Sequence, residues 1–161
     1  MQRVTLDDVK RSSVAHWNCS VARTLDVVGE WWSLLVVRNI FWGQHRFEDL
    51  QADLGIARNI LADRLSSLVE AGVLEKRRYQ ERPERFEYHL TEQGEDLFGV
   101  LMELMRWGDR WRAPDGPPLM VRHLACDHDS APGTVCSHCG GLMGPGDVRL
   151  TKGPGFHPLP A

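Results

Sequence analysis

Cysteine and histidine residues in the last third of the chain have the types and spacing that bind a metal ion. Cys136 and Cys139 are separated by two residues, and the glycine that follows allows the tight turn that points two thiolates at one ion. Zinc in structural sites takes four such ligands in a tetrahedron. With Cys126 as the third ligand and His123 as the fourth, the sequence predicts one structural zinc per chain.

Other interpretations of this cluster stay open. Only one Cys-x-x-Cys pair is present, so His128 or His138 can replace His123 as the fourth ligand. A ribbon that holds no metal and is stabilised by packing alone fits the same residues. A thioredoxin-like redox pair is disfavoured, because no βαβ pattern surrounds Cys136 and Cys139.

Cys19 is a separate candidate for thiol chemistry. The pattern places it at the start of a helix over residues 20–28, and a helix N-terminus lowers the pKa of a thiol and raises its reactivity. Cys19 is therefore a candidate redox sensor. The alternative is that it serves as a small, half-buried apolar residue at a contact between subunits.

Arg58 and Asn59 begin a helix that we expect over residues 57–71. A helix fits the major groove of DNA, and side chains near its N-terminus reach base edges. Arg can bind O6 and N7 of guanine together, and Asn can bind N6 and N7 of adenine, each contributing about 1–3 kcal/mol of discrimination. The sequence therefore predicts that this end of the helix reads bases. An apolar stripe on the opposite face consists of Leu61, Leu65, Leu68 and Val69.

Three more charged residues belong to the candidate DNA surface. Arg64 either contacts a phosphate or pairs with Asp63. Asp63 is unfavourable near phosphates, so we expect it to pair with an arginine, and a contact with a cytosine amino group is the alternative. Arg46, just before the preceding helix, is the third member.

Residues 76–86 form a local basic run with five positive and two negative charges, whereas the whole chain carries a net charge of −3. Such a run suits contacts with phosphates, or insertion of Arg82 beside the minor groove. The alternative is a solvated strand edge whose charges prevent aggregation. The candidate phosphate-binding residues here are Lys76, Arg78, Arg82 and Arg85.

The elements that must position these residues follow from the apolar pattern. The periodicity predicts helices over 20–28, 31–42, 47–54 and 57–71, strands over 73–79 and 85–90, and a helix over 92–112. Two short helices joined by Gly55 and Ile56 outline a helix-turn-helix. The polar loop over 80–84 contains Pro83 and joins the two strands into a hairpin, so the outline is that of a winged helix. The almost wholly apolar run WWSLLVVRNIFW predicts a buried central helix.

The helix over 92–112, which Thr91 is placed to cap, carries apolar residues on two faces. One helix with two apolar faces suggests a second partner, which we interpret as a dimer interface. The first face consists of Leu97, Leu101, Leu104, Met105, Gly108 and Trp111, and the residues outside it are Phe98, Met102 and Trp107.

Composition and length limit the class of protein. The 161 residues suffice for one domain with a small appendage. The chain lacks an apolar run of about 18 residues and its start lacks the apolar centre of a secretion signal, so we expect a cytoplasmic protein that does not enter a membrane. No nucleophile elbow, phosphate loop or carboxylate pair indicates an enzyme. We expect an N-terminal arm over 1–18 with one short helix capped by Thr5, a domain over 19–112, a linker over 113–118 and a ribbon-like tail over 119–161.

The segment from Cys19 to Trp111 resembles the HxlR-type family of bacterial winged helix-turn-helix regulators. The residues that match, in order, are CSVARTLDVVGEWWSLLVVRNI, RFEDLQADLGIARNILADRLSSLVEAGVLEKR, RPERFEYHLTEQG and WGDRW. The resemblance implies a homodimer built from the first and last helices of the domain, with the 57–71 helix in the major groove and the wing on the flanking backbone. It also implies a cysteine that senses oxidants in some members at the position of Cys19. Family members commonly have serine where this chain has Ala57, so the usual cap of the reading helix is expected to be missing.

Together these patterns predict a mainly α fold with a small β-hairpin wing (α+β) and a C-terminal ribbon-like extension. They predict a sequence-specific transcriptional regulator, a repressor that binds a palindromic operator in double-stranded DNA as a homodimer and responds to thiol chemistry or to a small-molecule inducer of unknown identity. The alternative is a winged-helix interaction module that has lost DNA binding and docks a partner through its tail.

Overall fold

The computed structural model describes residues 13–130 and 133–156. The predicted short helix after Thr5 lies outside this part of the chain. Within it, no helix is long and apolar enough to cross a membrane.

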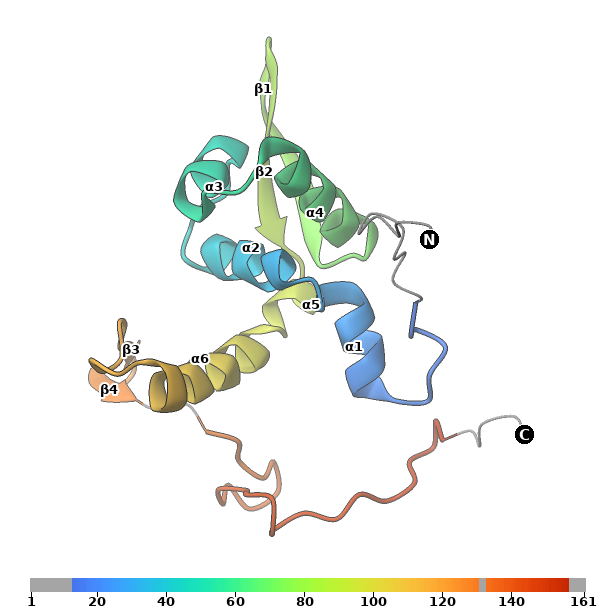
Figure 1. The fold of residues 1–161 in the computed structure, drawn as a ribbon, viewed down its shortest axis with the longest axis vertical. Coiled ribbons are helices and arrows are strands. Elements are labelled where there is room, and N and C mark those ends of the chain that lie inside the picture. The colour runs from blue at the N-terminus through green and yellow to red at the C-terminus, as the bar shows by residue number, and fades with distance from the viewer. Residues whose placement is uncertain (1–12, 131–132, 157–161) are drawn as a thin grey trace, which may run out of the picture.

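Four helices pack around one core: α1 (Ser20–Val28), α2 (Trp31–Phe41), α3 (Phe47–Leu54) and α4 (Arg58–Glu70) (Figure 1). The predicted stripe of α4 is the buried side, with Leu61, Leu65 and Leu68 at most 1% exposed. The remaining fully buried core residues come from α1, α2, α3 and the segments after α3 and α4: Val28, Val36, Val37, Ile40, Leu50, Ile56, Val73 and Leu74.

The centre of α2 is buried as predicted, but the prediction that residues 31–42 are buried throughout is wrong. Trp31 is 69% exposed and Trp42 is 53% exposed. Trp31 packs on Trp32 with ring centroids 4.8 Å apart, and the guanidinium of Arg38 lies 4.8 Å from the Trp42 ring. The buried residues of α2 lie between Ser33 and Ile40, so the helix is longer than the core it crosses and its terminal rings lie at the surface.

A fully buried amide joins α2 to the helix-turn-helix. The Asn39 Nδ2 donates to Gln44 Oε1 at 2.8 Å and to Asp53 Oδ2 at 2.7 Å. Its Oδ1 accepts from Nε and Nη2 of Arg38, at 2.9 and 2.7 Å. Because every polar atom of this 0%-exposed side chain has a partner, the network fixes the end of α3 against α2.

The wing consists of β1 (Leu74–Glu81) and β2 (Glu84–Leu90), paired antiparallel from Leu74↔Leu90 to Glu81↔Glu84. The predicted five-residue loop over 80–84 is wrong: the turn is only Arg82 and Pro83, and the pairing register shifts between Arg78 and Gln80. The outer half of the hairpin projects into solvent (Figure 1), so its polar residues continue the strands without a buried face.

The predicted helix over 92–112 is also wrong as a single element. It consists of α5 (Glu92–Glu95) and α6 (Phe98–Arg112), with a break at Asp96 and Leu97. The Thr91 cap is confirmed, because its Oγ1 accepts from the Gly94 N–H at 3.2 Å. Gly94 lies so close to the residue before β1 that an added Cβ would be 2.2 Å from the Val73 carbonyl oxygen. The Leu97 N–H then bonds the Gly94 carbonyl at 3.1 Å, an i to i+3 contact that ends the first helix and lets α6 leave the core.

The tail begins at the far end of α6, and its described residues after β4 run as an extended trace beneath the domain (Figure 1). It contains a small antiparallel hairpin of β3 (Val121–His123) and β4 (His128–Ser130), and a single bridge between Val135 and Leu142. The Thr134 hydroxyl donates to Glu103 Oε1 at 2.8 Å and thereby ties the tail to α6.

Candidate nucleic-acid interface

The turn between α3 and α4 places the start of α4 at the surface. Gly55 ends α3 in the left-handed conformation, with φ of 60°, which glycine adopts without steric cost. Ile56 is 4% exposed and anchors the turn in the core. Ala57 is extended, with φ of −63° and ψ of 138°, so α4 begins at Arg58. Arg58 and Asn59 are both exposed, as a role in reading bases requires.

The side chain of Arg58 contacts an aromatic ring rather than a carboxylate. Its guanidinium carbon lies 4.7 Å from the centroid of the Phe47 ring. Within residues 13–130 and 133–156, no acidic side chain lies within ion-pair distance of Arg58. Ala57 provides no side-chain cap for α4, which agrees with the departure from the family pattern.

Asp63 and Arg64 form an ion pair with each other on the exposed side of α4. The expected pairing of Asp63 with an arginine is therefore present. Only 22% of the Arg64 side chain is exposed, so this arginine adds less net charge to the surface than its position suggests.

Arg46 joins the helix-turn-helix to the wing. Its Nε donates to Glu87 Oε1 at 3.0 Å, and its guanidinium lies 4.6 Å from the Tyr79 ring. The hydrogen bond to Glu87 raises the pKa of Arg46, and the same bond lowers the pKa of the Glu87 carboxyl. A phosphate would have to compete with Glu87 for this arginine.

The wing cations differ in their partners. Arg78 lies 3.3 Å from Glu84, whereas the ammonium of Lys76 lies 3.8 Å from the Phe86 ring centroid. Arg82 occupies the turn, and both Arg82 and Arg85 are exposed without an ion pair to any described residue. Arg82 and Arg85 are therefore the wing arginines that form no ion pair with a described carboxylate.

The predicted zinc ligands lie in two pairs. The His123 Nδ1 is 3.2 Å from Cys126 Sγ. The backbone N–H groups of Cys139 and His138, followed by the Cys139 thiol, lower the pKa of Cys136. In the part of the chain that the structure describes, no group of three or more His, Cys, Asp or Glu side chains is arranged to hold a metal ion.

Cys19 is exposed and is the residue that precedes the first turn of α1, where its carbonyl accepts from the Arg23 N–H at 3.1 Å. Its position at the helix start is the one that the sequence predicts. Apolar side chains of the same helix are exposed beside it, including Val21 at 68%.

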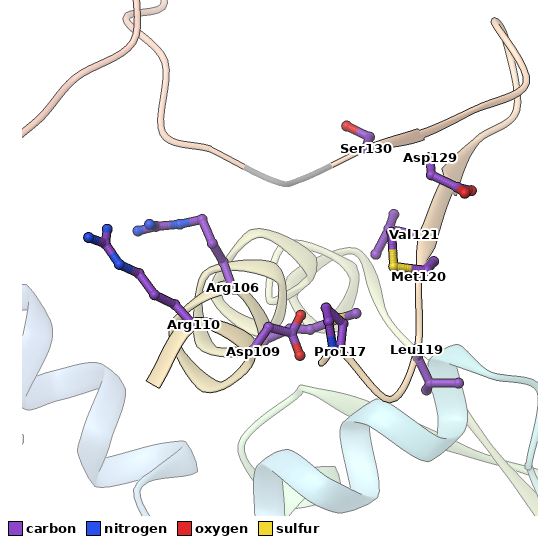
Figure 2. A pocket seen from close by; sticks show the side chains of 10 residues that line it. Arg106, Asp109, Arg110, Pro117, Leu119, Met120, Val121, Asp129 and Ser130 are labelled. Atoms are coloured by element: carbon purple, nitrogen blue, oxygen red, sulfur yellow. The ribbon is translucent and has the colours of Figure 1, made fainter. Parts of the chain in front are cut away.

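A hollow of about 480 Å³ lies between α6 and the β3–β4 hairpin. Asp109 of α6 and the run from Leu119 to Val121 lie on either side of it, and Arg106 and Arg110 extend from α6 away from the hairpin (Figure 2). Its volume lies in the range of small-ligand sites, about 300–1,000 Å³. No sequence pattern indicated this hollow, because its walls belong to separate elements that meet only in the fold.

Three of the candidate DNA-binding cations are held by Phe47, Phe86 and Glu87, residues that no sequence pattern linked to DNA binding. Phe47 fitted an inward-facing helix position, and Phe86 fitted a strand. The residues around Glu87 did not indicate that it would pair with Arg46, which lies 41 residues earlier in the chain.

Comparisons with known proteins identify the family of the chain. Residues 27–115 match the model of the HxlR-like helix-turn-helix family. The HTH-type transcriptional regulator Mb3122 of Mycobacterium bovis is 45% identical over 138 residues, which cover 85% of this chain and 87% of that protein.

Two solved structures are similar to this chain. The crystal structure of PA1607, described as a candidate transcription factor, is 36% identical with a TM-score of 0.77 and covers 86% of this chain and 98% of its own. The redox regulator HypR in its oxidised form is 30% identical with a TM-score of 0.53, over 58% of this chain and 98% of its own. The chain therefore belongs to the HxlR-like helix-turn-helix family and is a DNA-binding transcriptional regulator rather than an enzyme.

Proposed function

We propose that the protein is a homodimeric repressor that reads a palindromic operator, with α4 of each subunit in a major groove and the wing on the flanking backbone. The observation that carries this proposal is the exposed start of α4. Arg58 and Asn59 are exposed there, next to a wing whose tip carries Arg82. A helix N-terminus in this position reaches base edges, and wing cations reach phosphates.

The exposed apolar surface of α6 supports the dimer. None of the 15 residues of α6 is buried, even though several are apolar. The side chains of Phe98, Leu104 and Trp107 are 51%, 50% and 52% exposed. On α1, Leu25 is 53% exposed. Exposed apolar surface of this kind on a monomer is typical of an interaction site, and we infer that a second copy covers both helices in one symmetric interface.

Selection of bound DNA from a random library tests the reading of bases. We expect a palindrome whose half-sites are about one helical turn apart. Arg58→Ala and Asn59→Ala should each relax the sequence preference, whereas Arg82→Ala should weaken binding to all sequences alike. Affinity should fall steeply as salt rises, because phosphate contacts release counterions. Recovery of no enriched sequence would favour the alternative, an interaction module that docks a partner through its tail.

The dimer is tested by sedimentation. Leu104→Asp places a charge in the proposed interface and should yield monomers, and Leu119→Asp, on the tail, is the matched control that should leave the dimer intact. A dimer that persists in Leu104→Asp would move the interface away from α6.

Thiol response is proposed for Cys19, because the exposed thiol lies at the start of the helix that would join the dimer interface. Its modification would disturb the subunit contact and so release the operator. Diamide or maleimide treatment should weaken operator binding in the native protein and leave Cys19→Ser unaffected. Unchanged affinity after complete modification of Cys19 rules the sensor out.

Repression is tested with a reporter whose promoter overlaps the selected operator. The protein should lower expression of the reporter, and higher expression in its presence would identify an activator.

A structural zinc in the tail is proposed on the chemistry of its donors. His123 with Cys126 supplies one nitrogen and one sulfur, and Cys136 with Cys139 supplies two thiols. Four such ligands are a common set for zinc. Metal analysis of protein purified without a histidine tag should give about one equivalent of zinc, and Cys136→Ser should lose it. Less than about a tenth of an equivalent in the native protein would indicate a metal-free tail.

A further inference from the structure

Six cations on the proposed DNA-facing side are held by two kinds of partner. Carboxylates hold four of them, in the pairs Arg46 with Glu87, Arg64 with Asp63, Arg77 with Glu75 and Arg78 with Glu84. Phenylalanine rings hold two more, Arg58 on Phe47 and Lys76 on Phe86. A carboxylate cancels the charge of its partner and occupies its N–H donors. A ring attracts the cation but leaves its charge in place and its N–H donors available to DNA.

The contact between Phe47 and Arg58 connects the two helices of the helix-turn-helix at their first residues. Phe47 begins α3 and Arg58 begins α4. The Phe47 ring is half-buried and packs against the core, so its position is set by the fold. The guanidinium carbon of Arg58 lies 4.7 Å from the centroid of that ring. A long, exposed side chain is thus restrained by a partner that does not itself move freely.

We propose that Phe47 is a positioning residue for base recognition: its ring restrains the Arg58 guanidinium at the start of α4 while leaving the N–H donors available to a base edge. This inference rests on the proposed contact of Arg58 with a base. Ordering a free arginine on binding opposes association, so a side chain that is ordered beforehand binds its base more tightly. Non-specific binding, which depends on phosphate contacts, gains nothing from this restraint.

The test compares the affinities of variants for two duplexes of equal length, the operator from the library selection and a scrambled sequence, by fluorescence anisotropy. Phe47→Leu should weaken operator binding about threefold to tenfold and leave the affinity for the scrambled duplex within about twofold. Phe47→Tyr keeps the ring and should restore the native ratio. Combined with Arg58→Ala, Phe47→Leu should cause no further loss, because the side chain that it restrains is absent.

Phe41→Leu is the matched control for stability. Phe41 is another half-buried ring that packs on the core, and it contacts Phe98 rather than a cation at the DNA surface. Its replacement should lower the melting temperature comparably and leave the ratio of the two affinities unchanged.

If Phe47→Leu weakens binding to both duplexes equally, or still lowers the ratio in the Arg58→Ala background, Phe47 has only a structural role. If Arg58→Ala itself leaves the preference unchanged, the base contact in the proposed function is wrong. If Arg58→Ala relaxes the preference and Phe47→Leu does not, only the role of Phe47 is wrong.

Discussion

Restoring a cap to the reading helix should stabilise the protein. The first hydrogen bond within α4 runs from the Leu61 N–H to the Ala57 carbonyl at 3.0 Å, so the N–H groups of residues 58 to 60 precede the regular ladder. Ala57 already has the extended backbone of a capping residue, with φ of −63° and ψ of 138°. A serine hydroxyl at this position can therefore accept from one of these donors without a change of backbone. The same protein shows this arrangement at Thr91, which accepts from the Gly94 N–H.

The expected magnitude follows from one added hydrogen bond at a helix end. Replacing a capping serine by alanine costs about 0.5–2 kcal/mol, so Ala57→Ser should raise the free energy of unfolding by about 1 kcal/mol. For a domain of about 100 residues this corresponds to a rise of roughly 4–8 °C in the melting temperature. Urea unfolding measures it, with every variant at the same protein concentration because dimerisation contributes to stability.

The matched control for the cap is Ala62→Ser. Ala62 is exposed in the interior of α4, where serine has a lower helix propensity than alanine by about 0.5 kcal/mol and finds no free N–H group. Its unfolding midpoint should fall slightly while that of Ala57→Ser rises. Equal midpoints for the two variants, or a fall in Ala57→Ser, would refute the argument that α4 lacks a cap.

Three further predictions concern the network under α3 and the carboxylates of the wing. Asn39→Ala removes the buried amide that joins α2 to α3, and urea unfolding should show a loss of about 2–4 kcal/mol, whereas a loss below about 1 kcal/mol would contradict the network. Glu84→Gln removes a carboxylate near the DNA phosphates that the wing is proposed to contact. It should tighten binding to any duplex about twofold to fivefold at low salt and by less at high salt. Weaker binding would mean that Glu84 orients Arg78. Glu87→Gln should lower stability at neutral pH, because the hydrogen bond from Arg46 lowers the pKa of Glu87 below its ordinary 4.5. This contribution is present above pH 4.5 and is lost as the pH falls below it, so the stabilities of native protein and variant should converge in acid, and a constant difference would contradict the assignment.

Local patterns were sufficient to predict the elements that bury an apolar face. The spacing of Phe47, Leu50 and Leu54, followed by Gly55, predicted α3 with its correct bounds. The extent of the wing was not predictable in this way, because its outer residues are exposed on both faces and leave no period in the sequence.

The break between α5 and α6 depends on tertiary contact. Gly94 approaches the Val73 carbonyl and the chain turns at Asp96 and Leu97, yet the sequence over 92–112 has a continuous helical period. The candidate DNA residues could be selected by type and position. Their partners could not, because the contacts of Arg46 with Glu87 and of Arg58 with Phe47 join different elements and depend on how those elements pack.

The break at Asp96 and Leu97 also bears on the length of the operator. In the proposed dimer, α6 joins the two subunits and α4 enters the groove, so the bend between α5 and α6 sets how far apart the two reading helices stand. Two half-sites one turn of DNA apart require a separation of about 34–36 Å. A substitution that straightened this bend would therefore change the preferred number of base pairs between half-sites while leaving the sequence of each half-site the same. Spacing and sequence would then be determined by different parts of the same chain.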